Sequence, residues 1–135
     1  MKKGQVSPDF LVTIIFLGIF ALIIFGAYDQ MQNESIQTIE RLYAKDMADR
    51  VAESVNSVIM MGDGARKSIT LTTTLHGGKD YNITLRPNAV LVRWSDFAYA
   101  SRFATASLSA PEIPLEPGEL YLRNIDGTIY VEKVE

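Results

Sequence analysis

The feature that most constrains this chain is an uncharged run of nineteen residues from Phe10 to Tyr28. A helix rises about 1.5 Å per residue, so the run would be about 28 Å long, close to the roughly 30 Å hydrocarbon core of a bilayer. Secretory signals carry shorter apolar regions, of roughly 7 to 15 residues, and end in a small-residue cleavage site. The residues after Tyr28 contain no such site. The run therefore predicts a membrane-spanning helix over residues 10–28.

The charges that precede this run predict its orientation. Lys2 and Lys3 lie before it, and Asp9 is the one other charge before Phe10. Basic residues tend to stay on the cytoplasmic side of a membrane helix. We therefore expect a single-pass membrane precursor with a short cytoplasmic N-terminus, in which everything after Tyr28 is extracytoplasmic.

The residues before the run form a recognisable pattern. Lys2-Lys3-Gly4 is followed by Gln5-Val6-Ser7-Pro8-Asp9 and then directly by the apolar run. This arrangement resembles the class III signal peptide of archaeal type IV pilin-like proteins, in which the pattern Gln-x-Ser-x-Glu-x-x-x-Leu follows the cut. The chain departs from that pattern at Asp9, where Glu is commoner, and at Thr13, where Leu is usual.

The resemblance implies how the chain is processed and assembled. A prepilin peptidase would cut between Gly4 and Gln5, so that residues 1–4 are a leader peptide and Gln5 gains a free, largely protonated α-amine. Asp9 lies one helical turn away and would pair with that amine in its own chain or in a neighbouring subunit, aligning subunits in a filament. The alternative is that Asp9 lies at headgroup level and only favours helix initiation, because anions stabilise helix N-termini.

Length and composition limit what the exported part can be. Of 135 residues, the 107 after the first 28 are enough for one modest domain. There is no cysteine, which excludes disulfides, thiolate metal sites and a cysteine nucleophile. The net charge is −3, and loss of Lys2 and Lys3 would make it −5. Such a chain lacks the overall basic footprint of a nucleic-acid-binding protein, so we expect no nucleic-acid partner.

Beyond the membrane run the apolar residues become periodic. They recur every three or four positions, the spacing of one helix face, at Ile36, Ile39, Tyr43, Met47, Val51, Val55 and Val58. Ala44, Ala48 and Ala52 flank this stripe. The period is nearer 3.6 to 3.7 than the 3.5 of a coiled coil. This favours packing of the stripe on the chain's own sheet over a coiled coil with partners.

The ends of the helix are marked by residues with known end preferences. Pro8 suits a first helical turn, and Gly62-Asp63-Gly64 suits a helix end, because glycine tolerates the left-handed conformation found there. We predict one continuous helix from about Pro8 to about Met61, within a helical part over residues 5–62 that is amphipathic over residues 29–61.

The remainder, residues 63–135, has the alternation of antiparallel strands. A loop over Gly77 to Lys79 predicts a hairpin that shares one apolar face, with Tyr81 opposite Leu75, Ile83 opposite Thr73 and Leu85 opposite Leu71. At the next turn, the fixed negative φ of Pro87 excludes the primed two-residue types. A four-residue loop from Arg86 to Ala89 pairs Leu85 with Val90, Ile83 with Val92 and Tyr81 with Trp94.

The end of the chain carries the strongest hairpin signal, Asp126-Gly127. That turn pairs Leu122 with Val131 and Asn124 with Ile129, burying Leu120, Leu122, Ile129 and Val131. Residues 95–118 alternate poorly and contain three prolines, so we place only one short strand there, near Ser101 to Thr105. The predicted fold class is α+β: a long N-terminal helix packed on a C-terminal antiparallel sheet of five or six strands, similar to a pilin lollipop.

The sequence shows no arrangement typical of an enzyme. His76 is the sole histidine and lies in a glycine turn, which excludes a zinc cluster built from several histidines. Glu112, Glu116 and Glu119 follow one another along a proline-rich segment, with no partner in the sequence that would separate their pKa values. We expect no catalytic residue, no metal and no cofactor. Asn33 and Asn82 match the N-glycosylation acceptor pattern, and Asn82 is expected to face outward.

Two hypotheses from different classes remain. In the first, the chain is a major or minor pilin: a structural subunit of an archaeal type IV pilus-like surface filament, whose partners are a prepilin peptidase, the membrane before assembly and other pilin subunits afterwards. In the second, the same helix is an uncleaved anchor for an extracytoplasmic interaction domain. A mature N-terminus at Gln5 indicates the first hypothesis, and an intact Met1 indicates the second.

Overall fold

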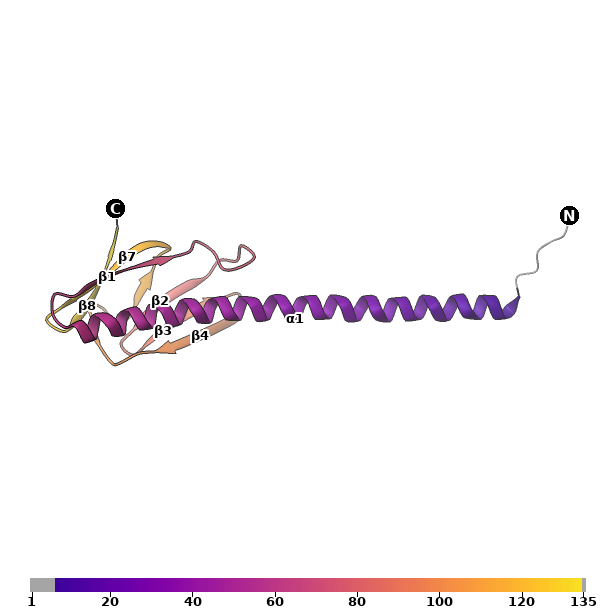
Figure 1. Cartoon of the computed structure of the whole chain (residues 1–135), viewed down its shortest axis with the longest axis horizontal. Helices are drawn as coiled ribbons and strands as arrows, with labels where there is room; N and C mark the ends of the chain where they lie inside the picture. Colours follow the sequence, from indigo (N-terminus) through magenta and orange to yellow (C-terminus); the bar gives the residue numbers. More distant parts are fainter. Residues whose placement is uncertain (1–6, 135) are drawn as a thin grey trace. The chain divides into compact units, whose positions relative to one another are not determined.

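The computed structural model describes residues 7–134, and the chain divides between Thr38 and Ile39 into two compact units (Figure 1). One helix, α1 (Pro8–Met61), runs through both units. Eight strands follow it, namely β1 (Arg66–Leu71), β2 (Asn82–Arg86), β3 (Ala89–Trp94), β4 (Phe97–Arg102), β5 (Ser107–Leu108), β6 (Ile113–Leu115), β7 (Gly118–Ile125) and β8 (Thr128–Lys133). The predicted α+β fold class and the bounds predicted for the helix are confirmed.

The first unit is the N-terminal part of α1. The carbonyl of Ser7 accepts hydrogen bonds from the backbone N–H groups of Phe10 and Leu11, at 3.0 and 3.3 Å. Pro8 therefore occupies the first helical position, where its missing N–H leaves no donor lost. The Thr13 hydroxyl donates to the carbonyl of Asp9 at 2.8 Å, so this polar side chain is satisfied inside the helix, as an apolar environment requires.

The apolar side chains of this unit are exposed. The exposed fraction is 68% for Phe16, 74% for Leu22 and 75% for Phe25. Helix α1 is long and apolar enough to cross a membrane. The uncharged run thus forms the expected helix, and its surface is apolar on all sides.

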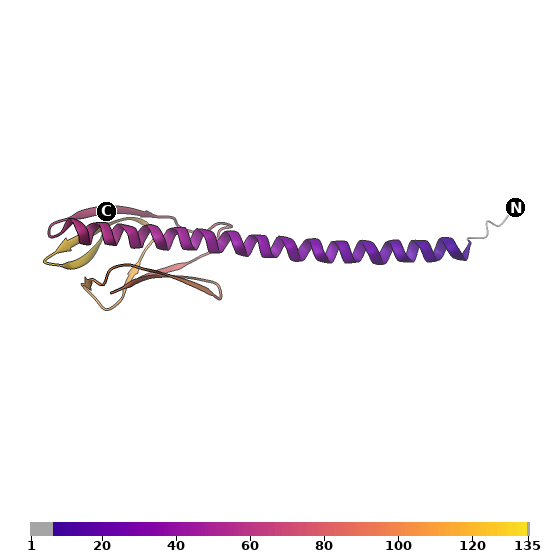
Figure 2. The ribbon, with the colours of Figure 1, turned by 60° about the horizontal axis from the view of Figure 1, so that its bottom comes forward.

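The second unit contains two four-stranded sheets, not the single antiparallel sheet of five or six strands that the sequence predicts. The strand orders are β1-β7-β8-β5 in sheet A and β4-β3-β2-β6 in sheet B. All pairs are antiparallel except β5 with β8, which are parallel. Figure 2 shows the last turns of α1 beside strands of both sheets.

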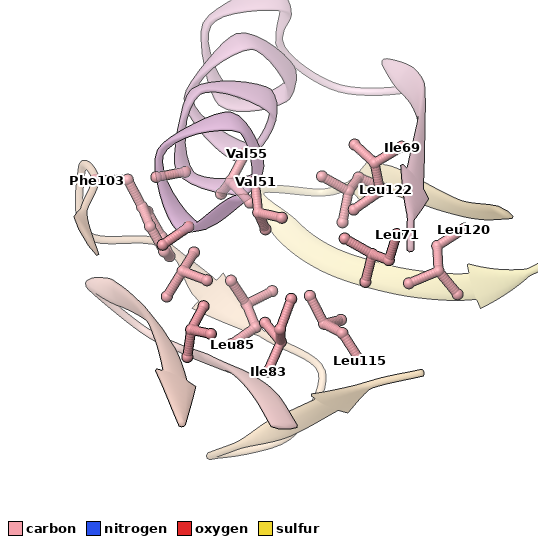
Figure 3. Close-up of a cluster of buried hydrophobic side chains, with 14 of the residues drawn as sticks. Val51, Val55, Ile69, Leu71, Ile83, Leu85, Phe103, Leu115, Leu120 and Leu122 are labelled. Atoms are coloured by element: carbon pink, nitrogen blue, oxygen red, sulfur yellow. The ribbon is translucent and has the colours of Figure 1, made fainter. Parts of the chain in front are cut away.

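From Glu40 onward α1 packs against these sheets, as the sequence predicts, since its periodicity favours packing within the chain over a coiled coil with partners. The centre of the buried face differs from the predicted stripe, because Ala44 and Ala48 are fully buried whereas Tyr43 is half exposed. The helix joins a single core to which both sheets and the intervening loops contribute (Figure 3). Its buried hydrophobic residues are Ala44, Ala48, Val51, Ala52, Val55 and Val58.

Two predicted registers are confirmed. In sheet B, Ile83 pairs with Val92 and Leu85 with Val90. The turn there is shorter than predicted, because Arg86 also pairs with Ala89 and leaves a two-residue loop. The predicted pair of Tyr81 with Trp94 is not formed, because the ladder between β2 and β3 starts at Asn82. In sheet A, Leu122 pairs with Val131 and Asn124 with Ile129 across the turn at Asp126 and Gly127, both of which have positive φ.

The hairpin predicted between residues 69–75 and 81–85 is wrong. Strand β1 pairs with β7, with Ile69 opposite Leu120 and Leu71 opposite Gly118, so the partner of β1 comes from far along the chain. Residues 72–81 form a loop that turns tightly at its centre, where the Leu75 N–H bonds to the Lys79 carbonyl at 2.9 Å. Alternation indicates a strand, but it does not specify which strand pairs with it.

The short strand predicted near residues 101–105 is also wrong in position. Strand β4 runs from Phe97 to Arg102 along β3. Phe103 leaves the strand and is buried in the core, and its N–H donates to the carbonyl of Asn88 at 3.2 Å. Because this segment is poor in alternation, tertiary contacts fix where its strand ends.

The end of α1 is tied to the β7–β8 hairpin. Gly62 and Gly64 have the positive φ that the predicted helix end requires. The Gly64 N–H donates to the carbonyl of Asn124 at 2.9 Å, and the Asp126 N–H donates to Oδ1 of Asp63 at 2.7 Å. The last turn of the helix is therefore fixed to sheet A by hydrogen bonds as well as by its apolar face.

Tyr81 connects the two ends of the 72–81 loop. Its ring is buried and its hydroxyl donates to the Thr72 carbonyl. Burial raises the pKa of Tyr81 above its ordinary value of 10.0, and the hydrogen bond to Thr72 opposes this increase only in part. The folded chain therefore favours the neutral phenol.

This raised pKa predicts a loss of stability in alkali. The contribution of Tyr81 is fully present below pH 10 and is lost as the pH rises through the higher pKa of the folded state. We expect the unfolding free energy of the Tyr81→Phe variant to fall less steeply than that of the parent above about pH 10. Denaturant titrations of the full chain in nonionic detergent measure the slopes. Tyr130→Phe, at an exposed position, is the matched control and should retain the parental slope.

Candidate functional site

Three residues of the expected processing and alignment site lie at the start of the chain. Gly4 and Gln5 fall outside the described residues 7–134. Asp9 lies in the first turn of α1 and is exposed. A carboxylate at this end of a helix interacts favourably with the helix dipole, whichever further partner it has.

The apolar part of α1 contains two interior glycines. Gly18 and Gly26 are helical, and a Cβ built on either would meet nothing within 4 Å in the described chain. Glycine in a helix interior costs about 1 kcal/mol relative to alanine, and no close approach within the chain requires either glycine. In membrane helices, small residues permit the backbone of another helix to come near.

The two acceptor asparagines are both accessible. Asn82 begins β2 and is exposed, with Ile83 beside it facing the core, so its predicted outward orientation is confirmed. Asn33 is exposed on α1 in the first unit. Each side chain is open to a modifying enzyme.

A buried carboxylate, which the sequence analysis did not single out, marks where α1 enters the core. Glu40 is 1% exposed and is the first buried residue along the described helix. Lys79, from the 72–81 loop, places Nζ 3.0 Å from Oε1 of Glu40. Within the described residues, neither carboxylate oxygen has a partner with hydrogen-bond geometry, so the contact is an ion pair by distance alone.

Two aromatic contacts involve helix residues that follow Glu40 in sequence. His76 stacks on Tyr43 with ring centroids 5.1 Å apart, and the Arg41 guanidinium lies 4.8 Å from the centre of the Phe97 ring. The histidine is exposed in its turn, as the sequence predicts, but it also packs on the helix. These contacts hold the 72–81 loop and the start of β4 against α1.

A hollow lies between α1 and β1. It is an open groove of about 460 Å³ whose lining includes Met47, Arg50, Val51, Ile69 and Leu71. Arg50 is already paired with Asp46 at 2.9 Å. The serines that reach this groove have no histidine beside them in its lining, so the groove presents no nucleophile and base pair of the hydrolase type.

The acidic segment before β7 is more paired than its sequence suggests. Glu112 lies 2.7 Å from Arg86, and Glu116 accepts a hydrogen bond from Lys133 at 2.7 Å. Lys133 lowers the pKa of Glu116 through that hydrogen bond and through its charge. The described residues hold no cluster of three His, Cys, Asp or Glu side chains that could bind a metal ion.

No family model, curated protein or solved structure matches this chain. The function therefore has to be argued from the residues themselves.

The Glu40–Lys79 pair predicts a strong asymmetry between single and double variants. Lys79→Met should lower the unfolding free energy by about 2 kcal/mol, because it leaves the buried Glu40 carboxylate without a partner. This loss is somewhat below the usual range for a fully buried pair, because Lys79 is 45% exposed. Glu40→Leu combined with Lys79→Met should recover most of that loss. Unfolding free energies from denaturant titration measure both. Arg50→Met, which breaks a pair of exposed residues, should cost less than about 1 kcal/mol. Equal losses in the Lys79 and Arg50 variants would contradict this account.

Proposed function

We propose that this chain is a structural subunit, a major or minor pilin, of an archaeal type IV pilus-like surface filament. It would be made as a single-pass membrane precursor and cut between Gly4 and Gln5 by a prepilin peptidase. The observation that carries the proposal is the order of features at the N-terminus. A basic pair, Gly-Gln and an acid four residues after Gln5 come directly before an uncharged helix.

The surface of that helix supports association with other helices. Its apolar side chains are exposed on every side, and beyond Tyr28 exposed apolar residues continue at Met31, Ile36 and Ile39. A helix that only anchors a domain needs no apolar residues past the membrane core. Exposed apolar residues spread over three further turns are instead suited to contact with neighbouring subunits.

The change of surroundings during assembly is energetically modest. Lipid tails and the interior of a helix bundle are both apolar, and the backbone hydrogen bonds of α1 are made within the helix. The polar Thr13 brings no penalty, because its hydroxyl is bonded to the Asp9 carbonyl. The interior glycines Gly18 and Gly26 leave room for a second helix to approach. The β domain would then be displayed on the filament surface.

Cleavage by the peptidase would give the chain a defined mature N-terminus. Membrane or filament protein from cells with the peptidase should have an intact mass lower by residues Met1 to Gly4 and should begin at Gln5. Gly4→Leu should abolish this cleavage, because a large side chain would obstruct access to the bond. Gly18→Leu is the matched control and should be cut normally. Met1 as the sole N-terminus in peptidase-containing cells would indicate an uncleaved anchor instead.

The role proposed for Asp9 is tested by substitution of its carboxylate. If its carboxylate pairs with the α-amine of Gln5, Asp9→Ala and Asp9→Asn should be cut normally but reduce incorporation into filaments by about tenfold or more, whereas Asp9→Glu should restore it. Quantitative mass spectrometry of sheared filaments against the membrane fraction measures incorporation. Normal incorporation of Asp9→Ala would leave Asp9 with only the helix-initiation role.

A further inference from the structure

The outer face of sheet B carries an unusual set of charges. In this sheet, Ile83, Leu85, Val90 and Val92 face the core, so their neighbours along each strand face outward. The outward positions of β2, β3 and β4 form three rows in the register of the sheet. These rows are Arg86, Ala89 and Arg102; Thr84, Leu91 and Ala100; and Asn82, Arg93 and Ala98.

The rows place three arginines around a floor of uncharged side chains. Arg86 and Arg102 lie two strands apart, about 10 Å between their Cα atoms, and Arg93 lies about 13 Å along the strands from their row. We call Arg86, Arg93 and Arg102 the arginine face. Arginine presents a planar fork of donors that matches carboxylate and sulfate groups.

The arginine face is only partly neutralised. Arg86 is paired with Glu112, whereas no acidic side chain of the described residues lies within ion-pair distance of Arg93 or Arg102, and both are exposed. The nearest acids in sequence, Asp80 and Asp96, lie in the loops outside these strands. Two of the three arginines, Arg93 and Arg102, thus have no ion-pair partner among the described residues, in a chain whose net charge is −3.

We infer that the arginine face binds an acidic polysaccharide, that is, a linear sugar polymer bearing carboxylate or sulfate groups. The charges are complementary, and spaced guanidinium groups above a flat floor suit a chain that lies across the sheet. The inference goes beyond the proposed function, because it concerns what the β domain recognises and not how the chain assembles.

Size argues against a second copy of this chain as the occupant. Three strands, β2 to β4, about 4.8 Å apart and about six residues long give a face of roughly 300 Å². A stable protein interface needs about 800 Å² on each partner. A narrow polymer that crosses the strands needs no larger surface.

The side chains argue against nucleic acid. Proteins that bind single strands stack bases on aromatic rings, but the aromatic residues of β4, Phe97 and Tyr99, pair with Trp94 and Val92 on the inner side of the sheet. None of the outward positions of β2 to β4 is aromatic.

The test uses the unassembled full-length chain in nonionic detergent, so that its result does not depend on filament formation. All proteins carry Asn82→Gln, which prevents a glycan from covering the face. The probes are dextran sulfate and polygalacturonate, with uncharged dextran and duplex DNA as comparisons. The test variant is Arg93→Ala with Arg102→Ala. The matched control, Arg66→Ala with Arg123→Ala, removes two exposed arginines from the outer face of sheet A.

We expect the test variant to raise the dissociation constant for dextran sulfate or polygalacturonate about tenfold and to reduce the dependence of binding on salt. The control should change the constant less than about twofold, and Arg93→Lys with Arg102→Lys should retain most of the affinity. Thermal unfolding of each variant establishes that the fold is kept.

Four outcomes would overturn the inference. The parent could fail to bind either acidic polymer, or both pairs of alanine variants could lose the same affinity. DNA could bind at least as tightly with the same dependence on Arg93 and Arg102, which would make this a nucleic-acid surface. Salt-sensitive self-association lost only in the test variant, without polymer binding, would make it a contact between copies of the chain.

Discussion

The second unit depends on how closely helix α1 approaches two sheets at once. Ala44, Ala48 and Ala52 are at most 3% exposed, so small side chains form part of the helix face that the sheets cover. Val51 and Val55, one turn apart, direct their side chains into the space between the sheets (Figure 3). The two sheets form no ladder with each other, and they meet through side chains that share one core with the helix. A larger side chain at any of the three alanines would separate helix and strand, and well-packed interiors tolerate such additions poorly.

The point at which α1 becomes buried is set by a charge. Before Glu40 the described helix has no buried side chain, and after it every turn as far as Val58 has at least one. A buried ion pair is seldom the most stabilising choice, because desolvation offsets much of the attraction. It is selective, however, because a buried carboxylate requires a cation at one location. Lys79 meets this requirement and so fixes where the 72–81 loop folds onto the helix.

Features set by local physics could be predicted from the sequence. The helix from Pro8 to Met61 follows from periodicity and end residues, and the turns at Pro87 and Asp126 fix the register of their hairpins because few conformations are open to them. The partner of β1 could not be predicted, because β7 lies about fifty residues away in sequence and an alternating pattern does not specify which strand pairs with it. The burial of Glu40 could not be predicted, because nothing in its sequence neighbourhood indicates that Lys79 comes to cover it. The arginine face was missed for the same reason: its three residues come from three strands, and only the register of the sheet brings them together.

A comparison of the two outer faces shows that the arginine face is not an ordinary solvated surface. Antiparallel sheets often expose polar residues on one side, and solubility is best served by mixed charges. Sheet A follows this rule, since Arg123 lies 4.0 Å from Glu132 and Glu119 faces outward on the same strand. In sheet B the outward positions of β2, β3 and β4 include three arginines and no acid, and the acid paired with one of them, Glu112, lies just before β6. Separation of charge on this scale costs electrostatic energy in the isolated chain. That cost is recovered when an anionic partner covers the face.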